Sequence, residues 1–334
     1  MKTKASSKPG LKITSLVLFF CAKIFFGDSA KRPTILRKSL LFIIKIILLK
    51  QFRNTILFKV IIMFKKRGKM DIQKLFNIDG KTALITGGSR GIGEMIAAGF
   101  LANGVKVYIT ARKEAPLIEK AKELSEKFDG ECIAIPCDLS NMEGIQKLAS
   151  DYLNYEESLD ILVNNAGAAW GEPYEKFSEK GWDKVMDTNV KSMFFLTRDL
   201  TPALVKNASD DEPSRVINIG SIDGINVPIF ETFSYSASKA AVHHLTRALA
   251  SKLVKENVLV NAIAPGPFPS MMLGSAVNHD YSGIAVRNPR KRVGTPEDIA
   301  GLAIFLCSRA GSYTIGETIT CDGGLVNASG HDLS

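Results

Sequence analysis

Residues 81–93, KTALITGGSRGIG, decide the fold of this chain. The first six form an apolar, β-branched run that predicts a buried strand, and a helical pattern begins at Gly91. Glycines in the intervening loop let the backbone turn tightly and approach a pyrophosphate at the positive end of the helix. The loop therefore predicts a dinucleotide site, with a ligand-free turn as the alternative, and the expected cofactor contacts are Thr86, Gly87, Ser89, Arg90, Gly91, Ile92 and Gly93.

The alternation of short apolar runs and helical stretches continues along the chain. Apolar runs with little polar alternation are typical of strands that helices cover on both faces. Strands that alternate with helices predict a single α/β domain with a doubly wound, Rossmann-like parallel sheet. We expect strands at 81–86, 105–110, 132–136, 160–163, 214–220, 258–263 and 318–321, and helices at 91–103, 115–128, 144–155, 180–206, 235–255 and 296–308.

The charge of the chain is unevenly distributed. Its 334 residues have a formal net charge of +9, which by itself suggests an anionic partner. Residues 1–69, however, hold 17 of the 43 bases and only one of the 34 acids, Asp28. The other 26 bases and 33 acids make residues 70–334 mildly acidic. This larger part therefore gives no support for nucleic-acid binding.

The basic leader at residues 1–69 has three interpretations. Its longest uncharged run, 13–22, is much shorter than the roughly 20 apolar residues that span a bilayer. Four bases lie on one half of a helical wheel, as in a helix on an anionic membrane surface: Lys45, Lys50, Arg53 and Lys59. A cleaved targeting segment is the second interpretation. We favour the third, an untranslated or dispensable leader before one domain at 70–334.

The end of the second expected strand indicates which dinucleotide binds. An acidic residue there binds the ribose 2′-hydroxyl of NAD and repels a 2′-phosphate. Residues 108–113, YITARK, contain no acid, and Arg90 and Arg112 are suited to a phosphate, so we expect NADP(H). The alternative is that Arg112 is a solvated loop charge. Asp138 and Leu139 are expected near the adenine, unless Asp138 caps the next helix.

From about residue 79 to 324, an ordered set of motifs resembles the short-chain dehydrogenase/reductase family. NNAG at 164–167 is similar to the family's cofactor-supporting turn, and NAIAPG at 261–266 to its segment under the nicotinamide. The resemblance implies a catalytic tetrad of Asn189, Ser221, Tyr235 and Lys239. It also implies cofactor contacts from Asn165, Ala166, Gly167, Tyr235, Lys239, Pro265, Gly266 and Ser270, with Ser270 holding the carboxamide.

Residue chemistry supports these roles. Tyr235 and Lys239 are four apart in an expected helix, so both project from one face, although such a pair in isolation is usually a surface pair. We expect the Lys239 ammonium to lower the pKa of Tyr235 from its usual value near 10, which suits a general acid or base. Ser221 is suited to hold the substrate oxygen. The resemblance implies that Asn189 anchors a water and that Lys239 binds the nicotinamide ribose.

Two features depart from the family's pattern. Ser221 and Tyr235 are 14 residues apart, one more than is common, and the run between them at 225–230 is bulky and apolar. Gly220 precedes Ser221, where many relatives have a second serine. The catalytic groups remain, but the substrate side of the site is expected to be particular to this chain.

Residues 257–324 are most similar to the 3-oxoacyl-[acyl-carrier-protein] reductases of the rhamnolipid-biosynthesis type. The resemblance implies NADPH-dependent reduction of a 3-oxoacyl thioester. Four apolar residues form either an acyl-chain lid or ordinary helix contacts: Phe268, Met271, Met272 and Leu273. A basic run either binds an acyl carrier protein or is solvated: Arg287, Arg290, Lys291 and Arg292. The alternatives are a dehydrogenase of a sugar acid, polyol or other small alcohol or ketone, and a non-catalytic nucleotide-binding scaffold.

The remaining cysteine and histidine residues predict no further site. The five cysteines form no Cys-x-x-Cys pair and are typical of reduced residues in a cytoplasmic protein. His243 and His244 lack a metal-binding motif, so we expect helix-surface or subunit-contact residues and no metal. The family resemblance implies a homotetramer. Peripheral membrane association is expected only if the leader is present.

Overall fold

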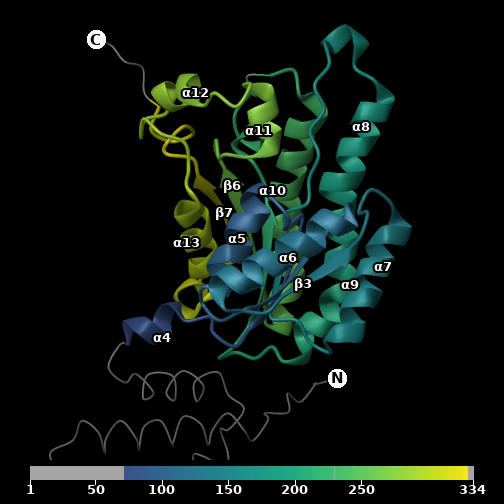
Figure 1. The fold of residues 1–334 in the computed structure, drawn as a ribbon, viewed down its shortest axis with the longest axis vertical. Helices are drawn as coiled ribbons and strands as arrows, with labels where there is room; N and C mark the ends of the chain where they lie inside the picture. Colours follow the sequence, from purple (N-terminus) through teal and green to yellow (C-terminus); the bar gives the residue numbers. More distant parts are fainter. Residues whose placement is uncertain (1–70, 229, 330–334) are drawn as a thin grey trace, which may run out of the picture. The chain divides into compact units, whose positions relative to one another are not determined.

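The computed structural model describes residues 71–228 and 230–329, which belong to one compact unit (Figure 1). The leader at 1–69 and its three interpretations lie outside the described residues. Within the described ranges, no helix is both long enough and apolar enough to cross a bilayer.

A parallel sheet of seven strands forms the centre of the described unit, in the order β3-β2-β1-β4-β5-β6-β7. It confirms the predicted doubly wound α/β fold. All seven strands run parallel, but the order in which they follow one another along the chain reverses between β1 and β4. Sheets of this kind bind nucleotides at that point. The strands are β1 (Thr82–Thr86), β2 (Lys106–Ala111), β3 (Cys132–Pro136), β4 (Ile161–Asn164), β5 (Ser214–Ile219), β6 (Val258–Pro265) and β7 (Thr318–Cys321).

Helices cover both faces of the sheet (Figure 1). One buried apolar core joins the sheet to α5 (Gly91–Leu101), α6 (Glu114–Phe128) and α13 (Pro296–Cys307). A second core joins the other face to α7 (Met142–Tyr155), α9 (Ser192–Lys206) and α10 (Phe233–Leu253). Within β1, Ala83 and Ile85 enter the first core and Leu84 enters the second, which explains the unbroken apolar run.

Most element boundaries agree with the sequence prediction to within two residues. The exception is the single helix expected at 180–206, which is divided into α8 (Glu179–Met186), a π-helical turn (Asp187–Lys191) and α9. A π turn inserts one residue into a helix, and a 3.6-residue apolar repeat does not reveal it. The shorter elements are α4 (Ile72–Phe76), η1 (Tyr174–Lys176), η3 (Ile222–Gly224), η4 (Val254–Glu256), α11 (Met271–Ala276), α12 (Ser282–Arg287) and η5 (Arg309–Gly311).

Candidate active site

The glycine loop after β1 is fastened to the turn after β4. Nδ2 of Asn165 donates to the carbonyl oxygens of Thr86, at 2.8 Å, and Gly87, at 3.1 Å. The Thr86 hydroxyl accepts from the backbone N–H groups of Asn165 and Ala166, each at 2.9 Å. A Cβ atom at Gly93 would lie 2.4 Å from Nδ2 of Asn165, so this position has no room for a side chain. The two cofactor motifs predicted from sequence therefore form one rigid unit.

The N-terminus of α5 has the properties of a phosphate-binding site. Gly91 has a φ of +59°, and its neighbour Arg90 makes no side-chain hydrogen bond to the first turn of the helix. The first N–H groups of a helix carry partial positive charge and need acceptors. The glycine loop and the first turn of α5, called the cradle below, thus fit the pyrophosphate of a dinucleotide.

Two exposed arginines flank this cradle. Arg90 lies at the start of α5 and Arg112 directly after β2. The N–H of Gly88 donates to the Thr110 carbonyl oxygen at 3.2 Å, which holds the glycine loop against the end of β2. Both guanidinium groups are therefore carried by segments that meet at this corner, an arrangement that suits a 2′-phosphate.

Asp138, in the segment after β3, does not cap the next helix. Oδ1 of Asp138 accepts from the Ser140 N–H at 3.0 Å, whereas the cap of α7 is Asn141, whose side chain accepts from the Gly144 N–H at 2.9 Å. The interpretation of Asp138 as a helix cap is wrong. Asp138 is exposed and Leu139 is buried at the same edge of the sheet, where an adenine is expected.

Ser221, Tyr235 and Lys239 meet where the end of β5 contacts α10. Nζ of Lys239 lies 5.4 Å from the centre of the Tyr235 ring and donates to the Ile219 carbonyl oxygen at 2.8 Å. A hydrogen bond with Ser221 acts on the Tyr235 hydroxyl. Ser221 and Lys239 are both buried, so water competes little with these contacts.

Burial controls the protonation of the pair. It raises the pKa of Tyr235 from 10 to about 12, and the hydrogen bond with Ser221 offsets part of this rise. Burial also lowers the pKa of Lys239 from 10.5 to about 8, against the opposing charge of Asp223. The expectation of a lowered pKa for Tyr235 is wrong for this structure, because burial and the charge of Asp223 raise that pKa more than the hydrogen bond with Ser221 lowers it. The phenol instead stays protonated near neutral pH.

Asn189 lies in the π-helical turn and is 3% exposed. Its Oδ1 accepts from the Ala168 N–H at 2.7 Å, and its Nδ2 donates to the Ala168 carbonyl oxygen at 3.0 Å and to the Ser238 hydroxyl at 2.9 Å. At Gly167, a Cβ atom would lie 3.3 Å from Oδ1 of Asn189 and 3.7 Å from Nζ of Lys239. Asn189 therefore ties the loop after β4 to α10 beside Lys239.

The segment after β6 lies against the glycine loop. Pro265 ends β6, and the N–H of Gly266 donates to the last carbonyl oxygen of β7 at 3.0 Å. Ser270 caps α11 by accepting from the Leu273 N–H at 3.2 Å. A Cβ atom added at Gly91 would lie 3.3 Å from the Cβ of Ser270, so the serine faces the cradle.

The four apolar residues considered for an acyl-chain lid differ in their exposure. Met271 and Met272, on α11, are about half exposed, at 52% and 45%. Phe268 is 2% exposed and belongs to the core, where a Cβ atom at Gly294 would lie 2.3 Å from its ring. The assignment of Phe268 to a lid is wrong, because its ring fills the space beside a glycine.

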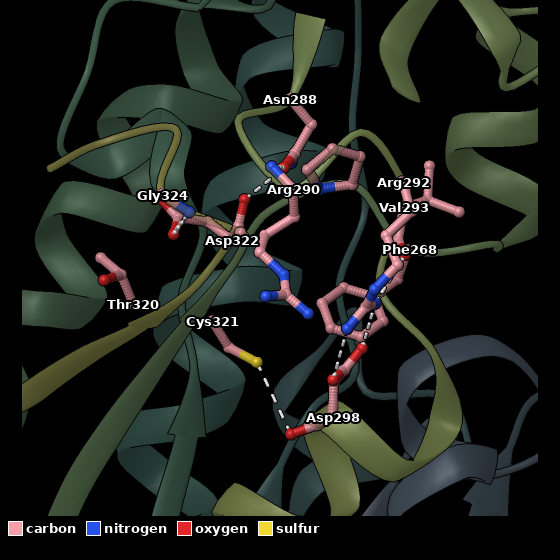
Figure 2. Close-up of a pocket in the computed structure, with 13 residues that line it drawn as sticks. Phe268, Asn288, Arg290, Arg292, Val293, Asp298, Thr320, Cys321, Asp322 and Gly324 are labelled. Atoms are coloured by element: carbon pink, nitrogen blue, oxygen red, sulfur yellow. Dashed lines mark hydrogen bonds and ion pairs between the residues drawn. The ribbon is translucent and has the colours of Figure 1, made fainter. Parts of the chain in front are cut away.

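A cavity of about 550 Å³ lies beside these residues, between the loop before α13 and the end of β7 (Figure 2). The guanidinium of Arg290 points into it, whereas Arg292 pairs with Asp298 at 3.0 Å. Arg287 and Arg290 are the exposed arginines of the basic run. The catalytic residues implied by the sequence do not line this cavity.

Two residues beside the catalytic groups were not predicted from the sequence as site residues. His243, expected at the helix surface or in a subunit contact, is 6% exposed within the single chain, and its Nε2 accepts from the Ser221 N–H at 3.4 Å. Its spacing of four from Lys239 was the available signal. Asp223 follows Ser221 by two residues, and burial raises the pKa of its carboxyl group while Lys239 opposes the rise. Among the described residues, no group of three His, Cys, Asp or Glu side chains is placed to hold a metal.

Comparisons with known proteins identify the family of this chain. Residues 87–326 match the family described as Enoyl-(Acyl carrier protein) reductase, a branch of the short-chain dehydrogenases/reductases. A rhamnolipids biosynthesis 3-oxoacyl-[acyl-carrier-protein] reductase of Pseudomonas aeruginosa is 45% identical over 251 residues, 75% of this chain and 97% of the relative. A 2-dehydro-3-deoxy-D-gluconate 5-dehydrogenase of Dickeya dadantii is 38% identical over 262 residues, 76% of this chain and 98% of the relative.

A solved structure extends the agreement to three dimensions. The RhlG/NADP active-site complex of Pseudomonas aeruginosa has a TM-score of 0.72 and 45% identity, and the match covers 75% of this chain and 98% of that one. The match therefore extends over nearly the whole length of that structure and supports the Rossmann-like fold of this chain. The chain belongs to the short-chain dehydrogenase/reductase family of oxidoreductases.

Proposed function

We propose that this chain is an NADPH-dependent reductase that converts a 3-oxoacyl thioester to the 3-hydroxyacyl thioester. The observation that carries the proposal is the convergence of Ser221, Tyr235 and Lys239 at the edge of the sheet that also bears the glycine loop. The name of the Pseudomonas aeruginosa relative, a 3-oxoacyl-[acyl-carrier-protein] reductase, supports the substrate class.

The residues around the cradle fit NADP(H). The glycine loop and the start of α5 bind the pyrophosphate, Arg90 and Arg112 the 2′-phosphate, and Asp138 and Leu139 the adenosine. The nicotinamide end is held by Asn165, Ala166, Gly167, Tyr235, Lys239, Pro265, Gly266 and Ser270. The cofactor supplies the hydride that reduces the carbonyl carbon.

Three side chains act on the substrate oxygen. Tyr235 donates its proton to the carbonyl oxygen, and a pKa of about 12 keeps that proton in place at neutral pH. Ser221 donates a hydrogen bond to the same oxygen as negative charge develops. Lys239, whose pKa is about 8, is mostly protonated at neutral pH and stabilises the phenolate that remains. Asn189 holds the adjoining loop in place.

The partners follow from charge and family. Exposed Arg287 and Arg290 suit an acidic acyl carrier protein that delivers the thioester. We expect a cytoplasmic homotetramer with α10 at one interface, as the family resemblance implies. Size-exclusion chromatography with light scattering measures the subunit number, and a monomer would contradict this expectation.

The proposed roles are tested by Tyr235→Phe and Ser221→Ala. With acetoacetyl thioester and NADPH, we expect Tyr235→Phe to abolish turnover and Ser221→Ala to lower kcat by about 10²–10³, the usual cost of losing an oxyanion donor. Binding of NADPH by Ser221→Ala, measured by fluorescence titration, is expected to remain near the wild-type value, because Ser221 acts on the substrate oxygen. Wild-type turnover in Tyr235→Phe would exclude the tyrosine as the proton donor.

A further inference from the structure

His243 occupies the same face of α10 as Tyr235 and Lys239. The three residues follow one another at intervals of four, and neighbouring positions at this spacing lie on successive turns of one helix face. His243 is 6% exposed, whereas the adjacent His244 is exposed. A buried imidazole needs a hydrogen-bond partner for each ring nitrogen.

Both partners come from the turn that carries Ser221. Nε2 of His243 accepts from the Ser221 N–H at 3.4 Å, so the proton of a neutral ring lies on Nδ1. A backbone hydrogen bond with Gly224 favours the protonated form of the ring, so the imidazole also interacts with the other end of this turn. The turn also closes on itself, because the Gly224 N–H donates to the Ser221 carbonyl oxygen at 3.0 Å. The imidazole thus bridges the two ends of a four-residue turn.

Two glycines leave room for this ring. A Cβ atom at Gly220 would lie 2.1 Å from Nε2 of His243, and a Cβ atom at Gly224 would lie 2.8 Å from its Cε1. Neither glycine has a positive φ, so close approach, not backbone conformation, accounts for the residue type. Gly220, at a position where many relatives have a serine, therefore leaves the space that the His243 ring occupies.

We propose that His243 is a positioning residue that fixes the Ser221–Gly224 turn on α10 and so sets the separation of the Ser221 and Tyr235 hydroxyl groups. This inference rests on the proposed roles of Ser221 and Tyr235. Nζ of Lys239 donates to the Ile219 carbonyl oxygen at 2.8 Å, two residues before Ser221. Side chains of α10 therefore hydrogen-bond to the backbone at two nearby positions at the end of β5. Burial and the charge of Lys239 lower the pKa of His243 to about 4, which keeps the bridging ring neutral at working pH.

The experiment compares His243→Leu, His243→Gln and His244→Leu in the full chain, on whichever carbonyl substrate the wild-type protein reduces. Leu removes the acceptor, and we expect kcat to fall about 10–100-fold, since an error near 1 Å costs up to ~10² in rate. KM and NADPH affinity should change less than about threefold, because ground-state binding does not depend on this alignment. Gln offers an amide oxygen near the place of Nε2 and should recover most of kcat. His244→Leu is the matched control and should behave as wild type.

A second pair of variants keeps the inference testable if His243→Leu does not fold. Gly220→Ser should impair kcat because of the close approach to the imidazole, and His243→Ala should impair it through loss of the acceptor. The double variant should lose less than the two single losses combined, because the clash disappears with the ring. The proposal is overturned if His243→Leu retains wild-type kcat, if His243→Gln loses as much as Leu, or if the paired substitutions are additive. Failure of the proposed function gives a different result: the wild-type protein then does not reduce 3-oxoacyl thioesters. The role of His243 can still be measured with another carbonyl substrate that the wild-type protein reduces.

Discussion

At the scale of single residues, burial determines how the catalytic groups hold their protons. Tyr235 and Lys239 were recognisable from their spacing, but the spacing did not reveal how far each group is removed from solvent. In the folded chain the pKa of the phenol rises to about 12 and that of the ammonium falls to about 8. The direction of a pKa shift depends on the surrounding fold, whereas the residue types that carry the chemistry are present in the sequence.

His243 provides a prediction of pH dependence. Its pKa is about 4 in the folded chain and about 6.5 when unfolded, because burial and the charges of Lys239 and Arg247 oppose protonation. Between these values the unfolded chain binds a proton that the folded chain does not, so the native state loses stability as the pH falls. This contribution reaches about 2–3 kcal/mol near pH 4.5.

The measurement is Tm against pH for the wild-type protein and His243→Gln. The wild-type Tm should fall more steeply than that of the variant between pH 7 and 4.5, so that the difference between them shrinks. A difference that stays constant across this range would mean that the imidazole is already protonated or exposed in the folded protein.

At the scale of elements, the strands were predicted more accurately than the surroundings of individual helices and loops. Strands β3 and β7 have their predicted bounds, because short apolar runs between turns admit few other assignments. Asn189 was identified as a site residue, but the π turn that presents it was hidden within one expected helix. Phe268 was misplaced, because an apolar side chain after a strand fits a lid or a core equally well until Gly294 is known to lie beside it.

The contact between α5 and α13 provides a prediction of stability. A Cβ atom at Gly99 would lie 2.5 Å from the Cβ of Ala300, so Gly99→Ala should destabilise the fold by about 1–3 kcal/mol through overpacking. Gly301, on the exposed face of α13, has nothing within 4 Å of such an atom. Gly301→Ala should therefore stabilise the protein by about 0.5–1 kcal/mol. Urea denaturation measures both, and equal effects of the two substitutions would contradict the close approach of the helices.

At the scale of the whole molecule, charge and chemistry occupy different parts of the chain. The positive net charge of +9 comes from residues 1–69. The catalytic and cofactor motifs lie within 71–329, which contain 26 of the 43 bases and nearly all of the acids. The order of those motifs was sufficient to predict the fold and the reaction class. Substrate preference could not be predicted in the same way, because the apolar run at 225–230 and the residues of α11 match no motif that names a substrate.

This division predicts that residues 70–334 retain the reductase activity. We expect the same kcat for the full chain and for 70–334, because the residues that act on substrate and cofactor all lie in the latter. Its mildly acidic balance also predicts no sedimentation with phosphatidylglycerol vesicles at physiological salt. Loss of activity on removal of residues 1–69, or vesicle binding by 70–334, would show that function and charge are not separable in this way.

The central claim is that a 3-oxoacyl thioester is the substrate and NADPH the reductant. The most direct measurement is initial rates on one panel of acetoacetyl and longer 3-oxoacyl thioesters, sugar-acid ketones and steroid ketones, each with NADPH and with NADH. We predict the highest kcat/KM for an acyl thioester with NADPH, and a loss of the NADPH preference in Arg90→Ala/Arg112→Ala. No turnover of any acyl thioester, together with turnover of a sugar-acid or steroid ketone, would contradict the account.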